Sequence, residues 1–193
     1  MSRPTVFLDR DGVLVRDEGL VTRNEQLILM PGVGPALMSL KNAGFALVVV
    51  SNQAVIARGL VDEVAVKDIN QHLAGRLLEA GGPQLDARRF CPHHPEATDL
   101  AYRVTCSCRK PAPGMIRQAA TDLDLDLRNS FMVGDRLTDV EAGAAAGCRT
   151  ILLKTGQHAA PRIVSAAPAG VVVEPDYVCA DLPAAARWIL REK

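Results

Sequence analysis

Two acidic residues separated by one position, Asp9 and Asp11, follow an apolar run near the start of the chain and precede Gly12. Side chains two positions apart share one face of a strand, so both carboxylates would lie together at its end. Carboxylates this close repel each other unless a cation or a shared proton lies between them. The pair therefore suits nucleophilic attack by one carboxylate and acid/base catalysis by the other, beside a hard metal ion. Two solvated acids in a turn explain this stretch alone equally well.

A third acid, Asp135, repeats the strand-then-acid arrangement of Asp9, and we interpret it as a metal ligand. Asp139 follows one helical turn later. It can orient Asp135 or a metal-bound water, and a helix-start charge that favours the macrodipole is an equally good explanation. Lys110 precedes Pro111, which favours an extended backbone at the lysine. Its ammonium group can neutralise a phosphoryl group, although an ordinary surface charge is the usual fate of lysine.

Hydrogen-bond donors follow another apolar run. Ser51, Asn52 and Gln53 come directly after residues 45–50, and a hydroxyl or an amide at a strand end can donate to an anion. A helix cap or a turn is the alternative. Arg58 follows on a loop, where it either reaches a phosphate or stays solvated.

Cysteine and histidine residues form paired spacings in the middle of the chain. The pairs are Cys91 with His93 and Cys106 with Cys108. Ligand pairs at both ends of a loop suit a tetrahedral zinc site, and four protein ligands leave no open position for substrate. The spacing therefore predicts a structural zinc loop over about residues 91–108, with chance spacing among reduced cysteines as the alternative.

Alternating strands and helices must position these residues. The apolar patterns predict strands over 6–8, 45–50, 88–91, 130–133, 150–153 and 171–173, and helices over 34–42, 62–80, 115–123, 139–146 and 181–191. Residues 159–169 are rich in alanine and proline and are predicted to form a surface loop. This alternation predicts a Rossmann-like α/β fold, with a mostly parallel sheet covered by helices on both faces.

Length and composition bound the function. The 193 residues suit a single domain over 1–193 and leave no room for a large cap domain. Lysine and arginine number 22, as do aspartate and glutamate, so the net charge of zero argues against nucleic-acid or membrane partners. No apolar run is long enough to span a bilayer, and the sequence lacks a signal peptide, so we expect a cytoplasmic protein. We also expect a monomer.

The order of the motifs resembles a known superfamily. Asp-x-Asp-Gly-Val, Ser-Asn-Gln, Lys-Pro and Gly-Asp-x-x-x-Asp occur in the order found in the haloacid dehalogenase-like phosphatases, over residues 6–153. Cys-Pro-His-His-Pro, followed by Cys-x-Cys-Arg-Lys-Pro-x-Pro-Gly-Met, is similar to the heptose 1,7-bisphosphate 7-phosphatases within it. The histidinol-phosphate phosphatases carry a similar loop.

The resemblance implies catalytic roles. Asp9 would attack phosphorus and form an aspartyl-phosphate, and Asp11 would serve as general acid and then base. Magnesium would be held by the Asp9 carboxylate, the Asp11 backbone carbonyl and Asp135. Ser51 and Lys110 would stabilise the phosphoryl group.

The resemblance also implies binding residues. The substrate, a small phosphorylated sugar, would contact Asp17, Glu18, Gly19, Leu20, Ser51, Asn52, Gln53, Ala54, Arg109, Lys110 and Arg136. Zinc would be held by Cys91, His93, Cys106 and Cys108. Two positions depart from the family pattern, because Val55 stands where the family has glycine and Leu20 where it has tyrosine. Both departures lie in substrate-contacting loops.

Three functions are consistent with these residues. The first is a magnesium-dependent phosphatase that removes the 7-phosphate of a heptose 1,7-bisphosphate. The second keeps the chemistry and acts on histidinol phosphate or another small phosphomonoester. The third is a zinc-stabilised binding module that has lost catalysis, against which the intact set of Asp9, Asp11, Lys110 and Asp135 argues.

Overall fold

A parallel six-stranded sheet forms the centre of the computed structural model, which describes residues 2–156 and 173–192. The elements in chain order are β1 (Arg3–Leu8), η1 (Asn24–Gln26), α1 (Val33–Asn42), β2 (Ala46–Asn52), α2 (Ala54–Ala57), α3 (Glu63–Glu79), β3 (Ala87–Cys91), η2 (Leu100–Tyr102), α4 (Gly114–Leu123), β4 (Leu125–Gly134), α5 (Leu137–Ala146), β5 (Arg149–Leu153), β6 (Tyr177–Cys179) and α6 (Leu182–Arg191).

The strand order places β1 in the middle of the sheet. The order is β3-β2-β1-β4-β5-β6, and every pairing is parallel. The first three strands follow one another from β1 through β2 to β3 on one side of the sheet. The chain then crosses to the other side of β1, where β4, β5 and β6 follow. In open α/β sheets such a reversal leaves a crevice at the carboxyl ends of the strands, where ligands bind. Asp9, directly after β1, lies at this crevice.

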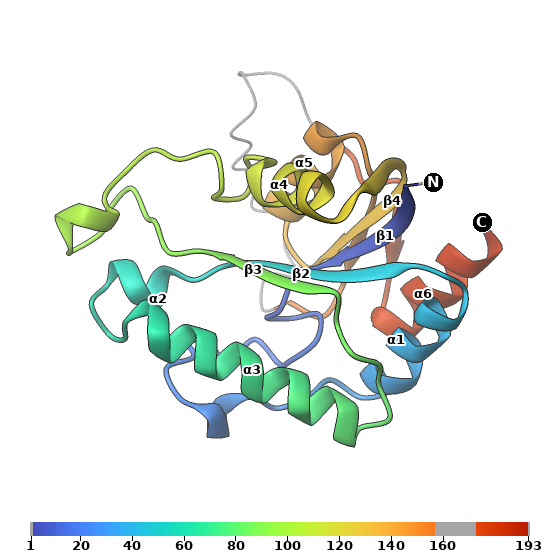
Figure 1. Cartoon of the computed structure of the whole chain (residues 1–193), viewed down its shortest axis with the longest axis horizontal. Helices are drawn as coiled ribbons and strands as arrows, with labels where there is room; N and C mark the ends of the chain where they lie inside the picture. The colour runs from blue at the N-terminus through green and yellow to red at the C-terminus, as the bar shows by residue number, and fades with distance from the viewer. Residues whose placement is uncertain (1, 157–172, 193) are drawn as a thin grey trace.

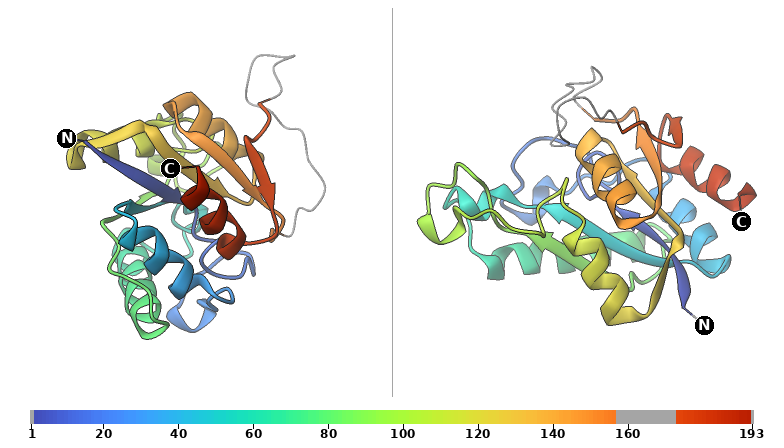
Figure 2. Two further views of the ribbon diagram at one scale, coloured as in Figure 1. Left: turned by 90° about the vertical axis from the view of Figure 1, so that its right-hand side faces the viewer. Right: turned by 90° about the horizontal axis from the view of Figure 1, so that it is seen from above.

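Helices cover both faces of the sheet (Figure 1). Side chains that alternate along β1 and β2 divide between two apolar clusters. One cluster packs Val6 and Leu8 against α1, α3 and α6, and the other packs Phe7 and Val48 against α4 and α5. The two helical layers can also be followed from the side in the left view of Figure 2. The predicted α/β fold with helices on both faces is therefore confirmed.

Two long connections extend beyond the carboxyl edge of the sheet. The first, the flap (residues 16–28), leaves and returns at one point, where the Arg16 amide donates to the Ile28 carbonyl at 2.9 Å. The second, the Cys–His loop (residues 91–108), follows β3 and leads back toward α4 (Figure 1). Neither connection contains more than a single short 3₁₀ helix, so the described residues include no large cap domain.

The predicted elements overlap those of the structure except near the C-terminus, although β4 begins at Leu125 rather than at the predicted residue 130 and the short helix α2 was not predicted. Val173 is not in a strand, while Val171, Val172 and the predicted loop over residues 159–169 lie outside the described residues. The last strand is instead Tyr177–Cys179, and the strand prediction at Val173 is wrong. The position of β6 is set by its pairing with β5, and a short apolar run in the sequence does not reveal that pairing. No helix among the described residues has the length and apolarity needed to cross a membrane.

Candidate active site

Three buried carboxylates meet at the carboxyl ends of β1 and β4. They belong to Asp9, Asp135 and Asp139, whose oxygens lie within 4.8 Å of one another. Asp9 is 7 %, Asp135 5 % and Asp139 1 % exposed. Three acids this close and this well buried need a cation nearby, because each negative charge raises the cost of ionising the others.

Lys110 supplies one positive charge to this cluster. Its Nζ lies 2.6 Å from Asp139 Oδ1 and 3.0 Å from Asp9 Oδ1, and it donates to the Val50 carbonyl at 2.8 Å. Burial alone would lower the pKa of Lys110, but the charges of Asp139 and Asp9 raise it above its usual value. The ammonium group is therefore held charged beside Asp9.

The backbone of Lys110 is fixed by Asn52 at the end of β2. The Asn52 Nδ2 donates to the Lys110 carbonyl, and the Lys110 amide donates to the Asn52 Oδ1, both at 3.0 Å. Next to it, the Gln53 Nε2 donates to the Ser51 Oγ at 2.7 Å. Because the Ser51 oxygen accepts this bond, its own hydroxyl proton is left to donate to a ligand.

Asp11 is paired with the residue that precedes it. The Arg10 Nε lies 3.0 Å from Asp11 Oδ1 and its Nη2 2.9 Å from Asp11 Oδ2, a two-point contact that fixes the carboxyl plane. Burial raises the pKa of Asp11, although the charge of Arg10 opposes it. A raised pKa suits a carboxyl group that must donate a proton near neutral pH.

Asp135 has the features of a metal ligand. Both of its carboxylate oxygens are buried, and neither has a hydrogen-bond partner among the described residues. Burial, followed by the charges of Asp139 and Asp9, raises the pKa of Asp135 to about 8. A Cβ at Gly12 or at Gly156 would lie 2.4 or 2.3 Å from Asp135 Oδ2, so these glycines leave the carboxylate its space. The donor set fits a hard divalent cation such as magnesium, which prefers carboxylate and carbonyl oxygens.

The two oxygens of Asp139 have different partners. Oδ2 accepts from the Arg136 amide at 3.1 Å and so caps the start of α5, while Oδ1 pairs with Lys110. The expectation of a helix-start role is confirmed. Toward Asp135, Asp139 acts through its charge, which raises the pKa of Asp135 more than the charge of Asp9 does.

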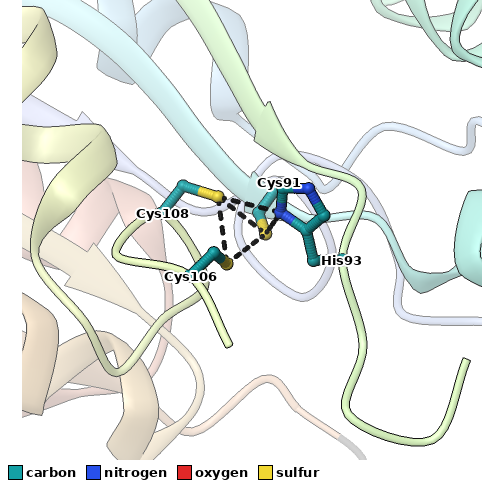
Figure 3. Close-up of side chains that lie close together, drawn as sticks. All are labelled: Cys91, His93, Cys106 and Cys108. Atoms are coloured by element: carbon teal, nitrogen blue, oxygen red, sulfur yellow. Dashed lines mark hydrogen bonds between the residues drawn. The ribbon is translucent and has the colours of Figure 1, made fainter. Parts of the chain in front are cut away.

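The second cluster lies in the Cys–His loop (Figure 3). The Sγ atoms of Cys91, Cys106 and Cys108 lie 3.1 to 3.6 Å from one another, and the His93 Nδ1 lies 3.3 Å from Cys108 Sγ. All four donor atoms face a common centre (Figure 3). Three sulfurs and one imidazole form the donor set of a closed, structural zinc site. Burial raises the pKa of Cys91 and of Cys108, an effect that a bound dication reverses by deprotonating the thiols.

A cavity of about 730 Å³ opens above the carboxylates. Its lining brings together the flap, the end of β2, the end of the Cys–His loop and the β4–α5 connection. The flap is attached to the opposite wall by Asp17, whose Oδ2 lies 2.8 Å from the Arg136 Nη2. At its other end, the Asn24 Nδ2 donates to Asp68 on α3 at 3.2 Å. The cavity is therefore walled by loops anchored to the sheet and its helices.

Three basic residues outside the predicted binding set also line the cavity: Arg58, His94 and Lys154. Arg58 follows α2, His94 lies in the Cys–His loop, and Lys154 follows β5. Burial lowers the pKa of His94, and the charges of Arg109 and Arg58 lower it further.

Comparisons with known proteins identify the family. Residues 107–185 match the HAD-hydrolase-like family model. A D-glycero-β-D-manno-heptose-1,7-bisphosphate 7-phosphatase of Photorhabdus laumondii is 42 % identical over 155 residues, which cover 80 % of this chain and 82 % of the relative. The protein of the same name from Escherichia coli K12 is 40 % identical over 167 residues, 86 % of this chain and 87 % of the relative.

The chain belongs to the D-glycero-β-D-manno-heptose-1,7-bisphosphate 7-phosphatase family. The resemblance stated from the sequence is thus confirmed. A crystal structure of the D,D-heptose 1,7-bisphosphate phosphatase from B. bronchiseptica, complexed with magnesium and phosphate, superposes with a TM-score of 0.80. It shares 36 % identity and covers 98 % of this chain and 99 % of its own. Members of the 7-phosphatase family are phosphatases, so the chain is a phosphoric monoester hydrolase of the HAD superfamily.

Nearly all the catalytic, magnesium-binding and substrate-binding residues that the family resemblance predicts line this cavity. The cavity is lined by Asp9, Asp11, Asp17, Gly19, Leu20, Ser51, Asn52, Gln53, Ala54, Arg109, Lys110, Asp135 and Arg136. Glu18 is exposed and lies outside the cavity lining. Val55, which departs from the family pattern, is 2 % exposed and packs with Ile56 and Val66.

Sequence reasoning did not find the partners of two predicted residues. The pairing of Arg10 with Asp11 has one available signal, because Arg10 stands between two aspartates directly after an apolar run, where a buried charge needs a counter-charge. The pairing of Lys110 with Asp139 joins a loop residue to a residue in the first turn of α5, 29 positions later, and no local pattern reports it.

Proposed function

We propose that this protein is a magnesium-dependent phosphatase that hydrolyses the 7-phosphate of D-glycero-β-D-manno-heptose 1,7-bisphosphate through an aspartyl-phosphate intermediate. The observation that carries the proposal is Asp9, a buried carboxylate beside the Lys110 ammonium at 3.0 Å and at the floor of the cavity. The names of relatives that are 40 to 42 % identical support the substrate and its β anomer.

The first half of the reaction transfers the phosphoryl group to Asp9. A carboxylate oxygen of Asp9 attacks phosphorus, and the bond between phosphorus and the sugar oxygen breaks. Asp11 donates its proton to the leaving oxygen, a role supported by its raised pKa. The Ser51 hydroxyl and the Lys110 ammonium bind the phosphoryl oxygens, which carry the negative charge in the transition state.

The second half releases phosphate. Water attacks the phosphorus of the aspartyl-phosphate, and Asp11, now ionised, accepts the water proton. The bond between phosphorus and the Asp9 oxygen breaks, which restores the free carboxylate. Arg10 holds the Asp11 carboxylate by two hydrogen bonds and supports its ionised form in this step.

The acidic cluster would hold the magnesium ion through Asp9, the Asp11 backbone carbonyl and Asp135. The unpartnered oxygens of Asp135 support this assignment, as does the magnesium in the crystallised B. bronchiseptica relative. When bound, the ion would neutralise charge on the carboxylates and on the phosphoryl oxygens. Zinc would be held by Cys91, His93, Cys106 and Cys108 as a structural ion, away from the chemistry.

The test is phosphate release, with magnesium, from both heptose 1,7-bisphosphate anomers and from histidinol phosphate, compared by kcat/KM. We expect a strong preference for the β anomer. Equal or better use of histidinol phosphate would replace the proposed substrate while keeping the chemistry, and Leu20 and Val55 would be the first positions to examine. No phosphate release from any of the three would contradict the proposed phosphatase reaction.

The covalent mechanism has its own test in Asp9→Asn. The variant should fold, with an unchanged circular dichroism spectrum, and kcat should fall at least about 1,000-fold because the nucleophile is lost. Substantial residual activity in a folded Asp9→Asn variant would rule out the aspartyl-phosphate.

A further inference from the structure

The chain leaves β5 through a short segment, the β5 exit (residues 154–156), which borders the acidic cluster. The Lys154 amide donates to the Cys179 carbonyl at 2.9 Å, which ties the start of this segment to the end of β6. At the other end of the segment, Gly156 lies so close to Asp135 that a Cβ would overlap the carboxylate. The β5 exit is therefore fixed to the sheet and contacts one of the proposed magnesium ligands.

Thr155 joins the β5 exit to the loop that carries Asp11. Its hydroxyl donates to the Gly12 carbonyl, although the two residues lie 143 positions apart in the sequence. A hydroxyl has a single proton to donate, so this contact uses the donor capacity of Thr155 completely. Among the described residues, no other hydrogen bond reaches the Gly12 carbonyl. The orientation of this carbonyl therefore depends on Thr155.

Gly12 is the residue at which this loop could otherwise rotate. Its φ is +77°, a conformation that glycine adopts readily and that other residues rarely adopt. The peptide before Gly12 is held by the Gly12 amide, which donates to the Val15 carbonyl at 2.8 Å. The peptide after Gly12 is held by the contact with Thr155. With both neighbouring peptide planes held, rotation about the Gly12 backbone is restricted.

The peptide before Gly12 contains the Asp11 carbonyl. In a planar trans peptide the C=O and the N–H point in opposite directions, so the Asp11 carbonyl points away from Val15. Among the described residues, no hydrogen bond reaches this carbonyl, which leaves its oxygen available to a cation. Gly12 also lies so close to Asp135 that a Cβ would overlap the carboxylate. The carbonyl and the carboxylate therefore come from segments that are in direct contact.

We propose that Thr155 is a positioning residue of the magnesium site, where its hydrogen bond to Gly12 keeps the Asp11 carbonyl in the orientation that the ion requires. This inference rests on the proposed function, in which Asp9, the Asp11 carbonyl and Asp135 hold magnesium. Magnesium demands a nearly ideal octahedral arrangement of oxygens, so a carbonyl that turns with a mobile glycine binds it less well. A carbonyl that is already oriented also reduces the entropy lost on binding.

The test measures magnesium binding in the absence of substrate. The magnesium dependence of the melting temperature gives the dissociation constant of the ion, since a ligand that binds only the folded state stabilises it. We expect Thr155→Val to raise this constant about ten-fold or more, because a residue that orients a metal ligand is lost. Thr155→Ala removes the same hydroxyl and should give the same result. Thr155→Ser keeps the hydroxyl and should recover most of the affinity. The loss of phosphatase activity in Thr155→Val should shrink as the magnesium concentration rises.

Thr121→Val is the matched control. The Thr121 hydroxyl also donates to a backbone carbonyl, that of Arg117 at 3.1 Å, but at an exposed position on α4. This variant should bind magnesium with wild-type affinity. The inference alone is overturned if Thr155→Val and Thr155→Ala bind magnesium as tightly as the wild type, or if Thr155→Ser loses as much affinity as they do. A wild type whose melting temperature and activity do not respond to magnesium would overturn the magnesium dependence of the proposed function and this inference with it.

Discussion

Lys110 Nζ lies 2.6 Å from Asp139 Oδ1, and both side chains are almost fully buried. The lysine lies two residues after the Cys–His loop, and the aspartate lies in the first turn of α5. A buried ion pair is held by its geometry, and the loss of one partner leaves the other charge uncompensated. Asp9 also compensates Lys110, at 3.0 Å, so Asp139 supplies one of the two negative charges that hold the ammonium group beside Asp9.

The substitution Asp139→Asn tests this contribution. It leaves Lys110 with one fewer carboxylate, and the free energy of unfolding should fall by about 3 kcal/mol in urea denaturation. The matched control is Asp122→Asn, which breaks an ion pair with Arg89 at the same distance of 2.6 Å but on the surface. An exposed pair contributes about 1 kcal/mol or less. Similar losses in the two variants would contradict a special role for the buried pair.

The acidic cluster predicts a pH dependence of stability that magnesium should weaken. The pKa of Asp135 is raised to about 8, so the metal-free folded protein holds a proton that the unfolded chain releases above about pH 4. The folded state thus binds more protons than the unfolded state, and its stability falls as pH rises from about 4 to 8. Urea denaturation in magnesium-free buffer, without a chelator that would remove zinc, should show this decline at pH 5, 6, 7 and 8.

Magnesium should flatten that profile, because the ion replaces the proton on the cluster. Asp135→Asn, which cannot ionise, should also show a flatter profile in magnesium-free buffer. A wild type whose stability without magnesium rises between pH 5 and pH 8 would contradict the raised pKa of Asp135.

Gly156→Ala should weaken magnesium binding. Its new methyl group would lie 2.3 Å from Asp135 Oδ2, so the carboxylate must shift. Displacing a group that orients a metal ligand lowers metal affinity by about 10- to 100-fold. The magnesium concentration for half-maximal activity should rise accordingly. Gly75→Ala, in α3 with nothing within 4 Å of its Cβ, is the control and should leave the magnesium requirement unchanged. An unchanged requirement in Gly156→Ala would show that Asp135 has room to move.

Cys106→Ala should remove zinc from the Cys–His loop. The variant loses one of the four donors that face the common centre, and metal analysis of the purified protein should find a large loss of bound zinc. Cys148→Ala removes a buried cysteine outside the cluster and should retain the wild-type zinc content. Equal zinc in the two variants would exclude Cys106 as a ligand.

The strand ends were predictable from the sequence because the signal is local. A buried parallel strand gives an unbroken apolar run, and the polar residue that follows it marks the carboxyl edge. Asp9, Ser51 and Asp135 are each found by this rule. The cysteine and histidine spacings are equally local, which is why the four donor atoms of the Cys–His loop are found together in the structure.

What the sequence did not reveal depends on contacts between distant segments. The ion pair of Asp17 with Arg136 joins the flap to the β4–α5 connection. The side-chain amide of Asn52 donates to the backbone carbonyl of Lys110, which lies 58 residues later in the sequence. No periodicity reports such pairs. The strand at Tyr177–Cys179 was missed for a related reason, since its position is set by hydrogen bonds to β5 and not by a long apolar run.

Lys110 lies two residues after Cys108, so zinc in the proposed site would couple metal supply to phosphatase activity. A zinc ion in the proposed site would not contact the sugar phosphate. It would instead order the segment that places the Lys110 ammonium group beside Asp9 and Asp139. A cell short of zinc would then make a chain whose catalytic acids lack their counter-charge. Activity would then be lost because Lys110 is displaced, although the proposed magnesium ligands remained intact.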